Sequence, residues 1–98
     1  MIYTLDVPMT IEDNQSVRIL EWHGQVGDAF AAGALVVELE THKALIEIRA
    51  DQPGILRDIR FAEGDWCPLG QTLALLSDTR DEALAPATGA WPAQFLIC

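Results

Sequence analysis

Apolar and polar residues alternate in short runs over the first 77 residues of the chain, and glycine-containing turns separate the runs. Alternation with a period of two residues is typical of β-strands that bury one face. No stretch between residues 1 and 76 shows a helical period. We therefore expect an all-β fold with strands near residues 2–7, 16–22, 29–30, 34–41, 44–49, 54–60, 66–67 and 71–76.

The turn residues of this pattern occur twice. Gly27-Asp28 followed by Gly33 recurs as Gly64-Asp65 followed by Gly70, displaced by 37 residues. Glycine adopts positive φ at little cost and aspartate bonds to nearby backbone, so both pairs are typical of turns. Two copies are too few for a solenoid, and they indicate two intertwined halves of one small domain. The prediction is a flattened eight-stranded antiparallel β-barrel or sandwich, a barrel-sandwich hybrid with quasi-two-fold symmetry.

The sharpest alternation lies between residues 36 and 49 and predicts a β-hairpin with a two-residue turn at His42-Lys43. The expected buried row pairs Thr41 with Ala44, Leu39 with Ile46 and Val37 with Ile48. The expected outer row pairs Glu40 with Leu45, Glu38 with Glu47 and Val36 with Arg49. A shift of one residue would bury charges, so the register is well specified.

The turn pair itself departs from local preference. Two-residue hairpin turns favour Asn-Gly or Asp-Gly, whereas neither His42 nor Lys43 readily takes positive φ, so we expect a type I turn. Such departures mark functional sites. Lys43 is the only lysine in the chain, and its amine would stand at the apex. A single modifiable amine and a composition that simply favours arginine both remain open explanations.

Charge and composition narrow the function classes. The chain has 98 residues, enough for one domain, and a net charge of −9, which argues against binding nucleic acid or an anionic membrane. Two cysteines without a CxxC motif, no signal peptide and no membrane-length apolar run lead us to expect a cytoplasmic protein. The facing Glu38 and Glu47, with Glu40 nearby, are either a solvated face or an acidic patch that partners recognise.

The chain changes character after residue 77, which divides it into an expected β-domain (1–77) and a linker-like tail (78–98). Asp78–Ala85 is compatible with one or two helical turns, and Pro86–Ala93 has a linker composition. The apolar end, residues 95–98, either packs on the domain or marks where a longer chain was cut.

The segment Glu40-Thr41-His42-Lys43-Ala44 resembles the Glu-Thr-Asp-Lys-Ala signature of lipoyl domains. The resemblance extends over residues 1–77 and includes Trp22 and the glycines of both halves. Lipoyl domains are modules of dihydrolipoyl acyltransferases in 2-oxo acid dehydrogenase complexes. The resemblance implies a flattened β-barrel of two four-stranded sheets and a non-catalytic carrier, with lipoate attached covalently to Lys43 as a swinging arm for acyl groups and reducing equivalents.

The resemblance also implies recognition residues and partners. Glu40, Thr41, His42 and Ala44 surround the lysine, and the family's glycines that help present the hairpin correspond to Gly27 and Gly54. His42 replaces the family's usual acidic residue, which puts partner recognition in question. The implied partners are a lipoate ligase or lipoyl transferase, a 2-oxo acid decarboxylase, an acyltransferase core and dihydrolipoyl dehydrogenase.

Other functions remain alternatives. A biotin carboxyl carrier domain would attach biotin to Lys43, although biotinyl lysines typically lie in Met-Lys-Met; an unmodified scaffold module would not need the lysine. No constellation supports an enzyme, and His23, His42 and Cys67 lack metal-ligand spacing, so no metal is expected. The repeat places Arg80 at the position of Lys43. The hairpin of the second half is therefore open at this point, and both chain termini are expected there, at the end opposite the lysine.

Overall fold

The computed structural model describes residues 1–7, 16–41, 44–80 and 89–97; residues 8–15, 42–43, 81–88 and 98 lie outside the described residues. The described residues form ten strands and no helix, so none of their segments is a helix that would span a membrane. The strands are β1 (Ile2–Asp6), β2 (Ser16–Trp22), β3 (Ala29–Phe30), β4 (Leu35–Glu40), β5 (Leu45–Ala50), β6 (Gly54–Ile59), β7 (Trp66–Pro68), β8 (Thr72–Ser77), β9 (Gly89–Ala90) and β10 (Ala93–Ile97).

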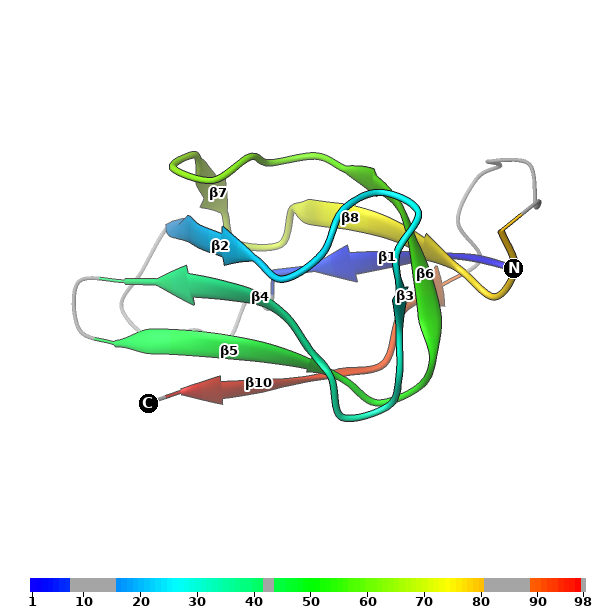
Figure 1. The fold of residues 1–98 in the computed structure, drawn as a ribbon. Helices are drawn as coiled ribbons and strands as arrows, with labels where there is room; N and C mark the ends of the chain where they lie inside the picture. Colours follow the sequence, from blue (N-terminus) through cyan, green and yellow to red (C-terminus); the bar gives the residue numbers. More distant parts are fainter. Residues whose placement is uncertain (8–15, 42–43, 81–88, 98) are drawn as a thin grey trace.

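The strands build two five-stranded sheets with a single apolar core (Figure 1). One sheet has the order β3-β6-β8-β1-β9, the other β10-β5-β4-β2-β7, and neither closes on itself. All neighbours are antiparallel except β1 and β9, which are parallel. Side chains that alternate along the strands meet in the core, for example Val17, Leu39, Ile48, Leu56 and Leu76, all fully buried. The all-β sandwich prediction is confirmed.

The quasi-two-fold symmetry is visible in the backbone hydrogen bonds of the two glycine turns. Gly27 and Gly64 have φ values of 99° and 90°, which only glycine adopts readily. The Gly27 amide donates to the Leu56 carbonyl at 2.7 Å, and the Gly64 amide donates to the Ile19 carbonyl at 2.8 Å. Donors and acceptors are both related by the 37-residue displacement, so the repeat in the sequence is a repeat in structure.

The last part of the chain differs from the expected linker. All eight predicted strands are present within a residue or so of their predicted ends, but β9 and β10 add a fifth strand to each sheet. The Trp91 side chain between them is buried, 4% exposed, and Ala93 and Phe95 pack against the core. The composition of this segment is typical of a linker, but one buried tryptophan and an alternating run of apolar residues are enough to attach it to the domain. Asp78–Arg80 is not helical, and the rest of the suggested helical turns lies outside the described residues.

The two ends of the described chain lie at opposite ends of the sandwich. The amino-terminal amine lies 3.3 Å from a carboxylate oxygen of Asp78, at the open second hairpin, as the repeat predicts. Strand β10, however, runs back along β5 and pairs Ile97 with Ile46, next to the first hairpin turn (Figure 1). The expectation that both termini lie far from Lys43 is therefore wrong for the carboxyl-terminal segment.

Candidate functional site

Strands β4 and β5 form the predicted hairpin, and their register is confirmed close to the turn. The structure pairs Val37 with Ile48, Glu38 with Glu47, Leu39 with Ile46 and Glu40 with Leu45. Four side chains of the inward row, Val37, Leu39, Ile46 and Ile48, are at most 1% exposed, and Thr41 and Ala44 next to the turn are partly exposed. Moving the hairpin by one residue would bury three glutamates in the core, so the turn is held on a rigid base.

The pairing predicted farthest from the turn is wrong. Arg49 pairs with Leu35 rather than with Val36, because the register shifts between Leu35 and Val37. Val36 and Val37 are both fully buried. An extra residue in one strand is a β-bulge, which bends the strand and increases its twist. The bulge lets two consecutive valines contribute to the core.

Hydrogen bonds between Thr41 and Ala44 close the hairpin at its tip. The Thr41 amide donates to the Ala44 carbonyl at 2.9 Å, and the Ala44 amide donates to Thr41 Oγ1 at 3.1 Å. The threonine hydroxyl thus satisfies an amide next to the turn. His42 and Lys43, the two residues that join Thr41 to Ala44, lie outside the described residues. The turn type and the role of these two residues remain predictions.

The glutamates on the outer face of the hairpin each have a partner. Glu40 accepts from Arg18 at 2.8 Å, Glu47 from Arg49 at 3.3 Å, and Glu38 lies 2.6 Å from His23 Nε2. Exposed pairs of this kind contribute at most about 1 kcal/mol each. The face is therefore a set of side chains paired by ionic contacts or hydrogen bonds rather than a bare acidic patch. The strand order, which places β2 beside β4, was needed to find Arg18 and His23 as partners.

Gly27 and Gly54 both lie at strand β6, away from the hairpin turn. Gly54 is the first residue of β6, which belongs to the opposite sheet. It follows the end of β5 that is remote from the hairpin turn. A Cβ on Gly54 would lie 2.9 Å from Trp91 Nε1. The Gly27 amide bonds to Leu56 in the same strand, β6, and the Gly27 carbonyl accepts from Arg80. The two glycines thus shape the far end of the domain.

The remaining singled-out side chains are structural. Cys67 is fully buried, and burial raises the pKa of its thiol to about 11, so it stays protonated and unreactive at neutral pH. The Trp22 indole donates to the Phe61 carbonyl at 2.9 Å and packs against the core. Trp66 is 50% exposed and lies at the edge of its sheet in β7.

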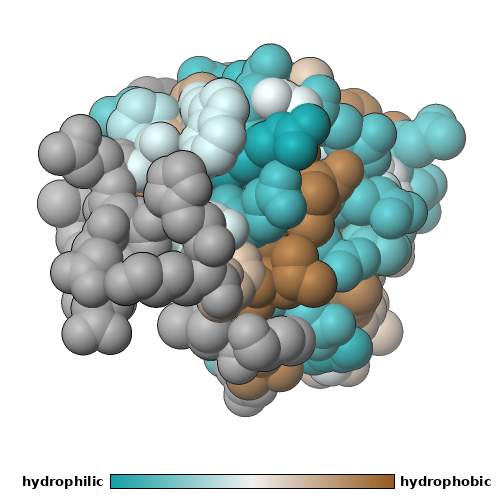
Figure 2. Space-filling view, turned by 90° about the vertical axis from the view of Figure 1, so that its left-hand side faces the viewer, coloured by the Kyte–Doolittle hydropathy of each residue, from teal (hydrophilic) through white to brown (hydrophobic). Residues whose placement is uncertain are grey.

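Apolar surface reaches the end of the molecule that carries the hairpin. Figure 2 looks onto this end and shows hydrophobic surface between hydrophilic residues. Leu45 and Leu96 are 45% and 42% exposed. Leu45 directly follows the turn segment in β5, and Leu96 pairs with Glu47 of the same strand, so both side chains lie on the outer face. Such exposed apolar side chains suit brief contacts with other proteins.

The fold and the hairpin define a class of protein. A sandwich of two quasi-symmetric halves, with the chain's single lysine in the segment that connects the strands of a register-locked hairpin, is typical of domains that carry a covalently attached cofactor. A family model described as "Biotin-requiring enzyme", the biotin/lipoyl family, matches residues 3–76. The chain belongs to this family.

Similar proteins of known description are acyltransferase components. The chain is 36% identical over 72 residues to the "Dihydrolipoyllysine-residue succinyltransferase component of 2-oxoglutarate dehydrogenase complex" of Staphylococcus saprophyticus, covering 74% of this chain and 17% of that protein. It is 31% identical over 83 residues to the protein of the same description from Bacillus subtilis, covering 85% of this chain and 20% of the relative.

A plant protein is also similar. It is "Dihydrolipoyllysine-residue acetyltransferase component 5 of pyruvate dehydrogenase complex, chloroplastic" of Arabidopsis thaliana, 36% identical over 65 residues, 66% of this chain and 14% of that protein. The chain thus spans a fifth or less of the length of these three relatives.

Proposed function

We propose that this chain is a lipoyl carrier domain in which lipoate is joined by an amide bond to Nζ of Lys43. The lipoyl-lysine arm passes acyl groups and reducing equivalents between active sites of a 2-oxo acid dehydrogenase complex. The observation that carries the proposal is the hairpin, whose buried base and Thr41–Ala44 closure leave His42-Lys43 as the connecting turn. The named relatives, all dihydrolipoyllysine-residue acyltransferase components, favour lipoate over biotin.

Attachment requires chemistry that this domain does not supply by itself. A lysine amine is protonated at neutral pH, so the modifying enzyme has to remove a proton before Nζ attacks the activated carboxyl carbon of lipoate. The C–N bond forms, the activating group leaves, and the amide carries no charge. Glu40, the hairpin carboxylate nearest the turn, is already paired with Arg18 at 2.8 Å and is not a free base.

The chain's own residues position the arm. The fully buried Leu39 and Ile46 fix the hairpin base, while the bonds between Thr41 and Ala44 hold the strands together up to the turn. When bound, the dithiolane supplies the sulfur that accepts an acyl group and is later reoxidised. The buried Cys67, held as a neutral thiol, cannot compete with that sulfur for the acyl group.

The partners follow from this role. We infer a lipoate ligase or lipoyl transferase for attachment, then a 2-oxo acid decarboxylase, an acyltransferase core and dihydrolipoyl dehydrogenase for turnover. A tether raises the local concentration of the arm at each active site without tight binding. The net charge of −9 favours basic docking faces on these enzymes. A cytoplasmic location is part of the same proposal.

Intact-mass measurement after co-expression with a lipoate ligase tests the proposal. The wild-type chain is expected to gain one lipoyl-sized increment, and Lys43→Arg, which keeps the charge but removes the nucleophile, is expected to gain none. A known lipoyl domain expressed in parallel shows that the ligase is competent. A biotin-sized increment in cells with a biotin ligase would favour the biotin carrier alternative. No increment beside a modified control domain would favour an unmodified scaffold and refute the proposal.

A further inference from the structure

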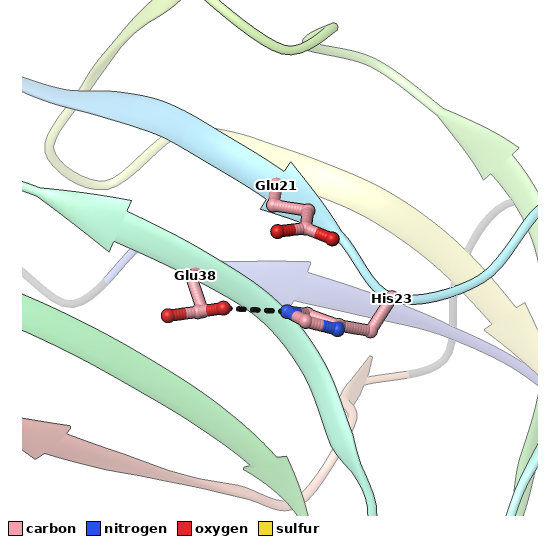
Figure 3. A group of neighbouring side chains, drawn as sticks. All are labelled: Glu21, His23 and Glu38. Carbon is pink, nitrogen blue, oxygen red and sulfur yellow. Dashed lines mark hydrogen bonds and ion pairs between the residues drawn. The ribbon is translucent and has the colours of Figure 1, made fainter.

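Three metal-ligating side chains converge on the outer face of the hairpin sheet, away from the turn (Figure 3). Glu21 lies in β2 and His23 directly follows the last residue of that strand, and this spacing of two residues points side chains to the same face of an extended chain. Glu38 of β4 pairs in register with Glu21. One ligand atom from each of the three residues lies within 4.8 Å of the other two.

The charges in this group are not balanced. Glu38 lies opposite a carboxylate on both sides, Glu21 in β2 and Glu47 in β5, and directly opposed like charges destabilise a strand pair. Glu47 has Arg49 as a partner and Glu38 has His23, whereas the side chain of Glu21 makes no hydrogen bond or ion pair with the residues that the structure describes. One imidazole carries at most a single positive charge, so it cannot balance two carboxylates.

The donor set matches a particular class of cation. One imidazole nitrogen and two carboxylate oxygens suit divalent first-row metals such as Zn²⁺, whereas Mg²⁺ and Ca²⁺ prefer more oxygen ligands. Tetrahedral Zn²⁺ with bonds of about 2.0–2.1 Å needs ligand atoms roughly 3.3 Å apart. In the structure the ligand atoms lie within 4.8 Å of one another. Rotation of the side chains, without movement of the backbone, would bring them to the distance that the ion requires. The His23 and Glu38 side chains are 28% and 26% exposed, which leaves a path for the ion.

We propose that Glu21, His23 and Glu38 bind a divalent transition-metal ion of the Zn²⁺ type, with water in the remaining coordination position. Metal coordination takes the place of the contact between His23 Nε2 and Glu38 at 2.6 Å, and the neutral ring then carries its proton on Nδ1. The bound ion cross-links β2 to β4, the first strand of the hairpin, and therefore stabilises the sheet that carries Lys43. This site does not depend on the lipoyl function.

Zn²⁺ titration of the full chain tests the site in a background that removes competing ligands. Lys43→Arg prevents attachment of a dithiol, and Cys98→Ser removes a second potential thiol ligand. Calorimetry is expected to show saturable one-to-one binding and a higher Tm with Zn²⁺. The chain has two histidines, so NMR gives an internal control: the ring signals of His23 shift on titration, while those of His42 do not.

Substitutions separate ligation from general attraction to an acidic surface. Glu21→Gln and His23→Gln each remove a ligand and are expected to weaken Zn²⁺ binding by about tenfold or more, since loss of a residue that only orients a metal ligand already costs about 10–100-fold. Glu47→Gln, which removes one negative charge from the same row but no ligand, is the matched control and changes the Kd less than twofold. Excess Mg²⁺ does not displace Zn²⁺. NMR spectra of the metal-free variants show that each is folded.

Several results would overturn the proposal. An equal loss of affinity in Glu47→Gln would indicate diffuse electrostatic attraction. A shift of the His42 signals in place of those of His23 would locate the ion elsewhere, and the absence of saturable binding by the folded chain would exclude the site.

Discussion

Replacing Gly54 by alanine is expected to destabilise this domain because the new methyl group meets Trp91. A Cβ on Gly54 would lie 2.9 Å from Trp91 Nε1 and 3.1 Å from both Cε2 and Cζ2, closer than carbon normally approaches a rigid ring. The indole cannot easily withdraw, since it is 4% exposed. Its backbone is fixed as well: the Trp91 amide donates to the Thr4 carbonyl at 2.7 Å, and the Asp51 amide donates to the Pro92 carbonyl at 3.0 Å.

The magnitude follows from the packing. Overpacking a well-filled core costs about 1–3 kcal/mol, and replacing glycine by alanine in a strand returns roughly 0.5–1 kcal/mol of chain entropy. Gly54→Ala should therefore lower the free energy of unfolding by about 1–2 kcal/mol, which corresponds to a Tm about 4–15 °C lower for a domain of this size. Urea and thermal denaturation followed by circular dichroism measure both quantities.

Two further variants make the reasoning refutable. Gly89→Ala is the matched control, since nothing lies within 4 Å of its added Cβ, and it should change stability by less than about 0.5 kcal/mol. In a Trp91→Leu background, where the ring is gone, Gly54→Ala should also cost less than about 0.5 kcal/mol, because contacting residues couple. An unchanged cost in that background would mean that Gly54 does not accommodate Trp91, and that the packing of residues 89–97 on the domain is wrong.

Three other outcomes check the core, the buried thiol and the surface pairs. Leu39→Ala should cost about 2–5 kcal/mol in urea denaturation, whereas Leu45→Ala, in the same hairpin but 45% exposed, should cost less than about 0.5 kcal/mol; the opposite ranking would refute the register. The Cys67 pKa is raised from 9.0 to about 11, so the unfolded thiol loses its proton first and stability should fall between these pH values, by up to about 1.4 kcal/mol per pH unit. Cys67→Ala should lack this fall, and a persistent fall would assign it to other groups. Glu40→Gln should cost under about 1 kcal/mol, and the difference should shrink in 1 M salt; a larger, salt-independent loss would show that the Arg18 pair is not a surface interaction.

The hairpin was predictable because its alternation leaves one register that keeps charge out of the core. The bulge at Val36 was not, since Val36 and Val37 are both apolar and alternation cannot show which of them is the extra residue. The glycine repeat predicted the symmetry because positive φ and the bonds of Gly27 and Gly64 are local properties of the turn sequence.

The long-range features needed the structure. No local spacing indicates a partner for His23, because its contact with Glu38, 15 residues away in the chain, arises from the pairing of β2 with β4. The strands after residue 88 were hidden by a composition rich in glycine, proline and alanine. Burial of Trp91 depends on the space above Gly54, far away in sequence, which no local pattern reveals.

Because β10 runs back along β5 towards the hairpin turn, the end of the chain that carries a tag affects access to Lys43. An affinity tag or fluorescent label placed after Ile97 would sit beside the hairpin turn and compete for space with a modifying enzyme. A tag before Met1 would lie near Asp78, at the opposite end of the sandwich, and would leave the turn accessible. Modification assays on this chain should accordingly use amino-terminal tags, and a carboxyl-terminal fusion offers a way to obstruct Lys43 without changing a single residue of the domain.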